Sequence, residues 1–168
     1  MTAAGKEIAP DHYRESFGRY FEDFAVGDIY EHRPGRTISD VDNTWFTLLT
    51  MNTHPLHFDE HYAEQSEFGR TLVNSCLTLS IVAGMSVSDL SYKAIANLGW
   101  DNIKLTAPVF PGDTLYAESQ VLAKRESKSR PTQGIVTART TGKKADGTVV
   151  MTYERSFLVP KIGHASGD

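Results

Sequence analysis

The chain has 168 residues and a mass of 18.6 kDa, which suggests one domain because domains usually comprise roughly 100–200 residues. Hydrophobic residues make up 40% and charged residues 23%, a composition that is typical of globular proteins and excludes a disordered chain. Cys76 is the only cysteine, so an intramolecular disulfide and a cysteine-built zinc site are both excluded. A lone cysteine fits a cytoplasmic protein.

The net charge of −4 argues against nucleic acid as a binding partner, since domains that bind nucleic acid are usually basic. No apolar run approaches 18 residues, so no membrane span is predicted. We expect a flexible N-terminal segment at 1–17, a single domain at 18–160 and a C-terminal tail at 161–168.

Residues from Asp40 to about Leu90 are predicted to be mainly helical. A strand is expected near 29–33, and Asp40 and Asp42 mark the start of a helix, where carboxylates are favourable. A break at 53–55 separates this helix from a short one at 59–66. Residues 72–90 are apolar on nearly all faces, which predicts a buried central helix with an inert, buried Cys76 thiol.

The second half has the alternation and the β-branched residues of strands. The predicted strands are 95–100, 103–105, 114–122, 133–141 and 148–159. Because strands and helices are segregated along the chain, the pattern favours an α+β fold, with one helix packed on a mostly antiparallel sheet.

Residues 51–60, MNTHPLHFDE, are the most unusual segment. Pro55 restricts His54 to extended geometry, which indicates a loop between helices. His57 is a candidate general acid and base, and the amide of Asn52 could orient a water or a carbonyl. The alternative for His57 is a surface or structural residue.

A metal site built from nearby His and Asp residues is a less favoured interpretation of the same segment. The candidates would be His54, His57, Asp59 and His61, but a proline interrupts them and the helical zinc-protease pattern is absent. Asp59 is better explained as a helix cap, so no metal is expected. The glycine-rich nucleotide motifs and the serine-hydrolase elbow are also absent.

Several segments together resemble the MaoC-like hydratase/dehydratase family. The string TMNTHPLHFDEHYA at 50–63 resembles its signature, and FGR at 68–70, FPGDTL at 110–115 and YFEDFAVG at 20–27 resemble further family segments. The similarity covers 18–160. It implies a hot-dog fold, in which five or six mostly antiparallel strands wrap around one long central helix.

The resemblance also implies a function and a set of site residues. It implies an enoyl-CoA hydratase, a hydro-lyase without a cofactor, that acts as a homodimer or as a larger assembly of dimers. The family histidine falls on His57 and the family asparagine falls on His54. The oxyanion-hole N–H falls on Ser75. The family aspartate falls on Asn52, which cannot take a proton.

The particular string NTHPLH resembles the branch of mesaconyl-CoA and itaconyl-CoA hydratases, whose substrates carry a second carboxylate. Arg70 and Arg36 are the candidates to bind such a carboxylate, because guanidinium groups bind it with two parallel hydrogen bonds. The alternative for Arg70 is a structural bond to loop carbonyls. Asn52 leaves open a thioester-binding subunit without catalysis. A hot-dog thioesterase is less favoured, because no acidic residue lies between Leu72 and Met85.

Overall fold

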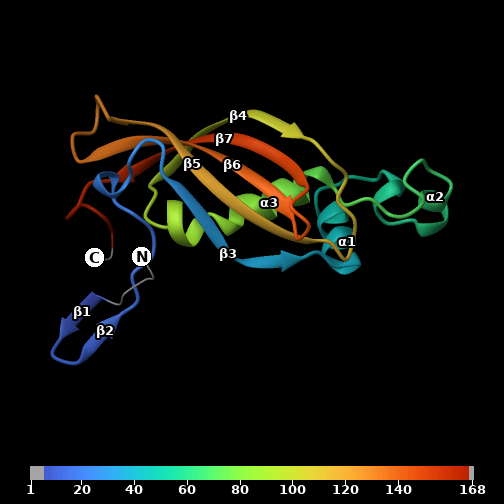
Figure 1. Ribbon diagram of the computed structural model, residues 1–168, viewed down its shortest axis with the longest axis horizontal. Coiled ribbons are helices and arrows are strands. Elements are labelled where there is room, and N and C mark those ends of the chain that lie inside the picture. Colours follow the sequence, from blue (N-terminus) through green and yellow to red (C-terminus); the bar gives the residue numbers. More distant parts are fainter. Residues whose placement is uncertain (1–5, 167–168) are drawn as a thin grey trace.

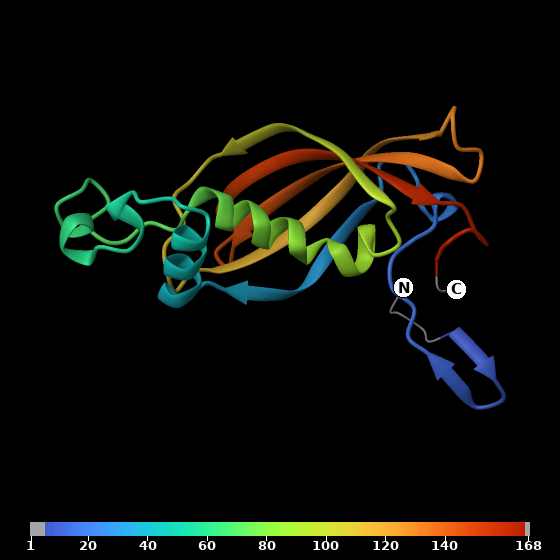
Figure 2. The ribbon, with the colours of Figure 1, turned by 180° about the vertical axis from the view of Figure 1, so that it is seen from behind.

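The computed structural model describes residues 6–166. Its body is a five-stranded antiparallel sheet with one long helix across its concave face (Figures 1 and 2). The strand order is β3-β5-β6-β7-β4, so β3 and β4 are the edges. The bounds are β3 Ile29–Thr37, β4 Ala96–Leu105, β5 Thr114–Glu126, β6 Gln133–Lys144 and β7 Val149–Pro160. The predicted α+β class is confirmed, and the two strands predicted at 95–100 and 103–105 form the single strand β4.

The central helix α3, Ser75–Met85, is shorter than the helix predicted at 72–90. It starts at Ser75 because Asn74 caps it: the side-chain oxygen of Asn74 accepts a hydrogen bond from the Cys76 N–H at 2.9 Å. The two residues before Asn74 hydrogen-bond through their backbone to other segments, so they cannot join the helix. Beyond α3, one π-helical turn (η3, Val87–Ser91) continues the chain.

Only one face of α3 packs against the sheet. Leu77, Thr78 and Val82 are buried there, and a Cβ atom on Gly142 of β6 would lie 2.7 Å from the Val82 side chain. Glycine at that position therefore allows the close approach of helix and sheet. The other face is exposed and carries small residues, namely Ser75, Cys76, Ser80 and Gly84. The prediction of a buried Cys76 is wrong, and the helix is less buried than predicted, because small side chains leave this face uncovered.

The core consists of two clusters along the sheet. One lies under α3 and is built mainly from Ile38, Val73, Leu77, Val82, Val109, Leu115, Val150, Met151 and Tyr153. The other lies at the opposite end, where the short 3-10 helix η1 (Phe21–Asp23) packs on the sheet, and includes Phe21, Phe24, Leu90, Val121, Val136, Phe157 and Val159. Alternating burial along β5 and β6 supplies residues to both clusters.

Helix α1, Asp40–Leu49, has its polar and apolar faces reversed relative to an ordinary surface helix. The exposed fraction is 1% for Asn43 and 0% for Thr47, whereas it is 72% for Trp45 and 79% for Leu49. α1 crosses the fold beside the N-terminal end of α3 (Figure 2). Its inward-facing polar side chains are therefore available for hydrogen bonds near the start of the central helix.

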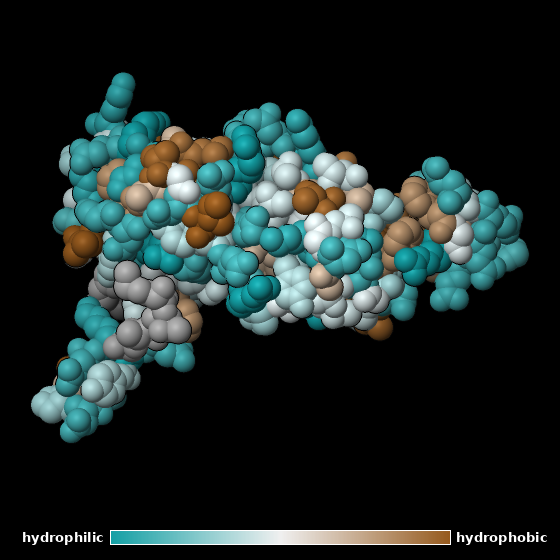
Figure 3. Space-filling model, in the orientation of Figure 1, coloured by the Kyte–Doolittle hydropathy of each residue, from teal (hydrophilic) through white to brown (hydrophobic). Residues whose placement is uncertain are grey.

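The remaining elements lie at the two ends of the molecule. The 3-10 helix η2 (Pro55–His57) and helix α2 (Glu60–Glu64) extend beyond α1, and a hairpin of β1 (Lys6–Ala9) and β2 (His12–Arg14) projects from the opposite end (Figure 1). Both of these extremities present mostly hydrophilic surface (Figure 3). The hairpin falls within the segment predicted to be flexible, a property that stays a prediction. Among the helices of residues 6–166, none is long and apolar enough to span a bilayer.

A buried polar network lies beneath the C-terminal end of α3. The guanidinium group of Arg155 on β7 is within 3.1 Å of the Ser86 and Ser91 hydroxyl groups and is 4% exposed. No carboxylate of the described chain forms a salt bridge with it. Nearby, His32 Nε2 lies 2.7 Å from the Ser119 hydroxyl, which lies 2.7 Å from the Thr140 hydroxyl. A buried cation and a chain of hydroxyl groups thus lie under this end of the helix.

Candidate active site

Asn43 organises the loop between α1 and α3. Its side-chain nitrogen donates to the carbonyl oxygens of His57, at 2.8 Å, and Leu72, at 3.0 Å. Its side-chain oxygen accepts a hydrogen bond from the Asn74 N–H at 2.8 Å. One buried amide therefore fixes the positions of three residues relative to one another: His57, the predicted acid–base residue; Leu72, in the extended segment before α3; and Asn74, the cap of α3. Sequence reasoning missed Asn43; the only signal was a pair of polar residues, Asn43 and Thr47, four positions apart.

His57 is half-buried, and its ring is oriented by one hydrogen bond. Nδ1 lies 2.8 Å from the Leu72 carbonyl oxygen, which can only accept. In the neutral ring the proton is therefore on Nδ1, and Nε2 carries the lone pair. This is the tautomer that a general base requires, with the base nitrogen pointing away from the group that orients it.

Asn52 and His54 are held in the turn that precedes η2. The Asn52 side-chain oxygen accepts a hydrogen bond from the His54 N–H at 3.0 Å, and His54 Nδ1 accepts one from the Leu56 N–H at 3.2 Å. The centroids of the His54 and His57 rings are 5.9 Å apart. The structure thus brings the two predicted histidines together. The Asn52 side-chain nitrogen donates to no other described residue, so it is available to a water or a ligand.

Ser75 is the first residue of α3, and its backbone N–H has no acceptor within residues 6–166. The first amides of a helix lack intrahelical partners, and the helix dipole adds positive potential there. An oxyanion is the natural partner for such a group. The cap formed by Asn74 satisfies the Cys76 N–H and leaves the Ser75 N–H open.

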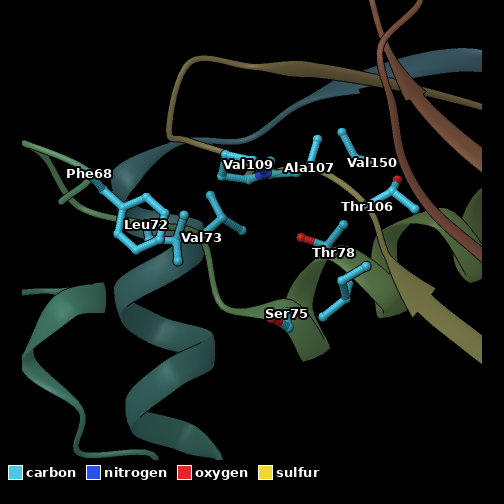
Figure 4. A pocket seen from close by; sticks show the side chains of 11 residues that line it. Phe68, Leu72, Val73, Ser75, Thr78, Thr106, Ala107, Val109 and Val150 are labelled. Carbon is cyan, nitrogen blue, oxygen red and sulfur yellow. The ribbon is translucent and has the colours of Figure 1, made fainter.

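A pocket of about 310 Å³ opens beside the start of α3 (Figure 4). Its walls are apolar except for the hydroxyl groups of Ser75, Thr78 and Thr106, and it contains no charged side chain. The apolar lining comes from Phe68, Leu72, Val73, Leu105, Ala107, Pro108, Val109 and Val150. Ser75 therefore lines the pocket directly, whereas His57 and Asn52 do not. His57 is linked to the pocket wall through the Leu72 carbonyl.

The two predicted arginines have different surroundings. Arg36 forms a 2.7 Å ion pair with Asp42, whose carboxylate also accepts from the Ser39 N–H and hydroxyl at the start of α1. Those bonds from Ser39, and then Arg36, hold the pKa of Asp42 below its usual value. Arg70 has neither a hydrogen bond nor an ion pair to another residue of the described chain, so the alternative of a bond to loop carbonyls is not found. Its guanidinium carbon lies 3.9 Å from the centroid of the Phe110 ring.

The metal interpretation has no geometric support within residues 6–166, where no group of three His, Cys, Asp or Glu side chains is arranged to hold an ion. Asp59 instead caps α2, because its side chain accepts from the Tyr62 N–H at 3.0 Å.

Comparison with known proteins identifies the family. The family model described as mesaconyl-CoA hydratase matches residues 10–168. The mesaconyl-CoA hydratase of Cereibacter sphaeroides is 35% identical over 86% of this chain and 42% of its own length. The (R)-specific enoyl-CoA hydratase of Rhodospirillum rubrum is 31% identical over 86% of this chain and 94% of its own length.

Solved structures show the same architecture. A putative MaoC domain dehydratase from Chloroflexus aurantiacus superposes with a TM-score of 0.82 at 34% identity, covering 86% of this chain and 41% of that one. Rv0216 of Mycobacterium tuberculosis, described as a double hotdog fold, superposes with a TM-score of 0.79 at 23% identity, over 90% of this chain and 48% of that one. The predicted hot-dog fold is confirmed. The chain spans about two fifths of the length of the mesaconyl-CoA hydratase that it matches. On the family match and these identities, the chain belongs to the mesaconyl-CoA hydratase family of MaoC-like hot-dog proteins.

Proposed function

We propose that this chain catalyses the reversible addition of water across the double bond of an enoyl-CoA thioester. The observation that carries the proposal is the hydrogen bond between His57 Nδ1 and the Leu72 carbonyl oxygen, which leaves Nε2 available as a base. Leu72 lies three residues before Ser75, whose N–H is free within the described chain, so the bond also links the base to the start of α3. Relatives named as mesaconyl-CoA hydratase and as (R)-specific enoyl-CoA hydratase support the same reaction class.

In the proposed reaction, the thioester carbonyl accepts a hydrogen bond from the Ser75 N–H, and the acyl chain occupies the adjoining pocket. The Asn52 side-chain nitrogen donates to a water, and His57 Nε2 removes one of the protons of that water. The water oxygen then bonds to the β-carbon, and the electron pair of the double bond moves toward the thioester oxygen. Ser75 and the dipole of α3 stabilise the resulting enolate. His57 finally returns its proton to the α-carbon, so the ring is regenerated.

Coenzyme A is part of the substrate in this scheme, so no separate cofactor is required and every proposed role is filled by the chain. We propose a homodimer in the cytoplasm as the working form. The edge strand β4 supports this assembly, because Leu98, Ile103 and Leu105 are exposed along it and an exposed apolar edge is unfavourable. Leu105 also lines the pocket, so a partner subunit joined along β4 would border the acyl chain.

The test is the loss of enoyl-thioester absorbance with purified protein, using crotonyl-CoA, mesaconyl-CoA and itaconyl-CoA. His57→Ala should lower kcat/KM by roughly 10²–10⁴-fold, the usual contribution of a general acid or base. His61→Ala is the matched control, since His61 is an exposed histidine of the adjoining helix whose ring contacts Gln65. An unchanged rate in His57→Ala would refute the proposal.

Asn52 supports a second candidate, a subunit that binds thioesters without catalysis. Asn52→Asp distinguishes the two functions, because it restores a carboxylate where the family has aspartate. Turnover that appears in Asn52→Asp from an inactive wild type would favour the binding subunit. Turnover already present in the wild type would favour the hydratase.

A further inference from the structure

Two cations lie over the Phe110 ring, Arg70 at 3.9 Å and Lys144 at 5.4 Å from its centroid. The sequence indicates Arg36 as a third candidate to bind an anion. Arg36 and Lys144 are already neutralised. Arg36 pairs with Asp42 at 2.7 Å, and Lys144 pairs with Asp113 at 2.7 Å. Arg70 is exposed and is paired with no acidic residue of the described chain. A guanidinium group in this state keeps its full charge and all five N–H donors for a ligand.

Arg70 is nevertheless held in place. Its guanidinium group lies over the Phe110 ring at 3.9 Å from the centroid, and Phe110 contacts Phe68 edge-on, with 6.4 Å between their centroids. Phe68 lines the pocket. Stacking engages the face of the guanidinium plane and leaves its edge free, so the N–H donors remain directed outward in the plane. The cation is thus positioned beside the pocket before any ligand binds, which reduces the entropic cost of recognition.

The pocket offers no cationic side chain to a carboxylate. Its lining side chains are apolar apart from the hydroxyl groups of Ser75, Thr78 and Thr106, and the Ser75 N–H is taken by the thioester oxygen in the proposed reaction. A carboxylate among them would be desolvated without a counter-ion, which is strongly unfavourable. An acyl chain with an anionic end must therefore place that end beyond these walls, and Arg70 is the cation that Phe110 and Phe68 link to them.

We propose that Arg70, presented by Phe110, is the specificity-determining residue that binds the second carboxylate of a dicarboxylic enoyl-CoA. The inference rests on the proposed function, because it assigns the acyl chain to this pocket. The phosphates of coenzyme A offer a guanidinium group similar chemistry. The carboxylate is favoured because Phe110, over which Arg70 lies, contacts Phe68 in the pocket wall. The experiment below separates the two sources.

The experiment measures binding by calorimetry with two saturated ligands that cannot be hydrated. Methylsuccinyl-CoA carries the second carboxylate, and butyryl-CoA lacks it, while both carry the same phosphates. Arg70→Gln should weaken the binding of methylsuccinyl-CoA by roughly 10- to 100-fold, the range expected for a lost charge-assisted hydrogen bond, and should leave butyryl-CoA unchanged.

Arg33→Gln is the matched control. Arg33 also stacks on an aromatic ring, with its guanidinium carbon 4.9 Å from the Tyr116 centroid, and it is exposed. Tyr116 alternates along β5 with Leu115 and Ala117, which belong to the core cluster under α3, so Tyr116 and the Arg33 stacked on it lie on the opposite face of the sheet. Arg33→Gln should therefore not affect either ligand.

Four results would overturn the proposal. Equal losses for both ligands in Arg70→Gln would assign Arg70 to the phosphates, and no loss for either would exclude anion binding. A loss in Arg33→Gln as large as that in Arg70→Gln would indicate a general charge effect. Equal affinity of the wild type for both ligands would show that no carboxylate is recognised. Because binding is measured without turnover, an inactive wild type would refute the hydratase assignment while leaving this test readable.

Discussion

Buried polar groups lie at both ends of helix α3, but the two sets make different contacts. At the N-terminal end, one amide, Asn43, satisfies three backbone groups and leaves the reactive atoms of His57 and Ser75 open. At the C-terminal end, the cation of Arg155 is buried against serine hydroxyl groups. Two buried side-chain atoms nearby, His32 Nδ1 and the Tyr153 hydroxyl, have no hydrogen-bond partner.

The difference concerns what each network leaves exposed. At the N-terminal end, the Asn43 side chain makes all of its hydrogen bonds to backbone groups of the protein. It therefore fixes the site without competing with the ligand for the open groups of His57 and Ser75. The C-terminal network is closed to solvent, and it carries titratable groups whose charge state affects folding rather than chemistry. Three substitutions test this contrast, in order of decreasing effect.

The largest effect on stability is expected for Asn43→Ala. The change leaves the His57 carbonyl and the Asn74 N–H without partners, and each unsatisfied buried group costs about 1–3 kcal/mol. We expect the free energy of unfolding to fall by about 2–4 kcal/mol, measured by urea denaturation, together with a loss of activity in the protein that remains folded. Ser80→Ala, on the exposed face of α3, is the control. A stable Asn43→Ala protein with full activity would contradict the role of Asn43.

An intermediate effect is expected from pH, acting through His32. Burial is the main cause that lowers the pKa of His32, and Arg155 and Arg19 lower it further, whereas Asp89 and Glu118 oppose them. The native protein therefore holds fewer protons than the unfolded chain, whose histidine titrates near 6.5. The contribution of the neutral His32 ring to the free energy of unfolding is therefore fully present above that pH. It is lost as the pH falls below it, by at most about 1.4 kcal/mol per pH unit. His32→Gln should remove this part of the slope in denaturation curves recorded at pH 5–8.

The smallest effect is expected for Arg155→Met. Because no carboxylate pairs with Arg155, its removal strands no opposite charge, and a residue of similar volume restores the packing. We expect a change of less than about 1.5 kcal/mol in the free energy of unfolding and unchanged activity. A loss above that value would mean that the cation itself secures this end of the helix. Thermal denaturation of the two proteins side by side provides the measurement.

Much of the fold was predictable because its signals are local. The alternation along β5 to β7 and the carboxylates at Asp40 and Asp42 indicate the strands and the start of α1 without reference to any tertiary contact. The start of α3 was not predictable in the same way. It depends on Asn74 as a cap, and hydropathy alone extends the apolar run back to Leu72.

In the candidate site too, the features that depend on nearby residues were predictable and those that depend on distant residues were not. His57, His54 and Asn52 lie within six residues of one another, so their proximity follows from the sequence. The orienting bond of His57 and the contacts of Asn43 join residues 14 to 31 positions apart, and no local pattern encodes them. The freedom of Arg70 compared with Arg36 likewise depends on which carboxylates the fold brings near each one.

The reversed polarity of helix α1 has a practical consequence for protein engineering. Substitutions chosen by hydropathy, which keep apolar residues and change polar ones, would disturb this helix instead of preserving it. Substituting polar residues for the exposed Trp45 and Leu49 would remove no contact within the folded chain that the core depends on, whereas making Asn43 or Thr47 apolar would remove the hydrogen bonds that hold the site. Any redesign of α1 should therefore treat its polar residues as the fixed ones and its large apolar residues as the adjustable ones.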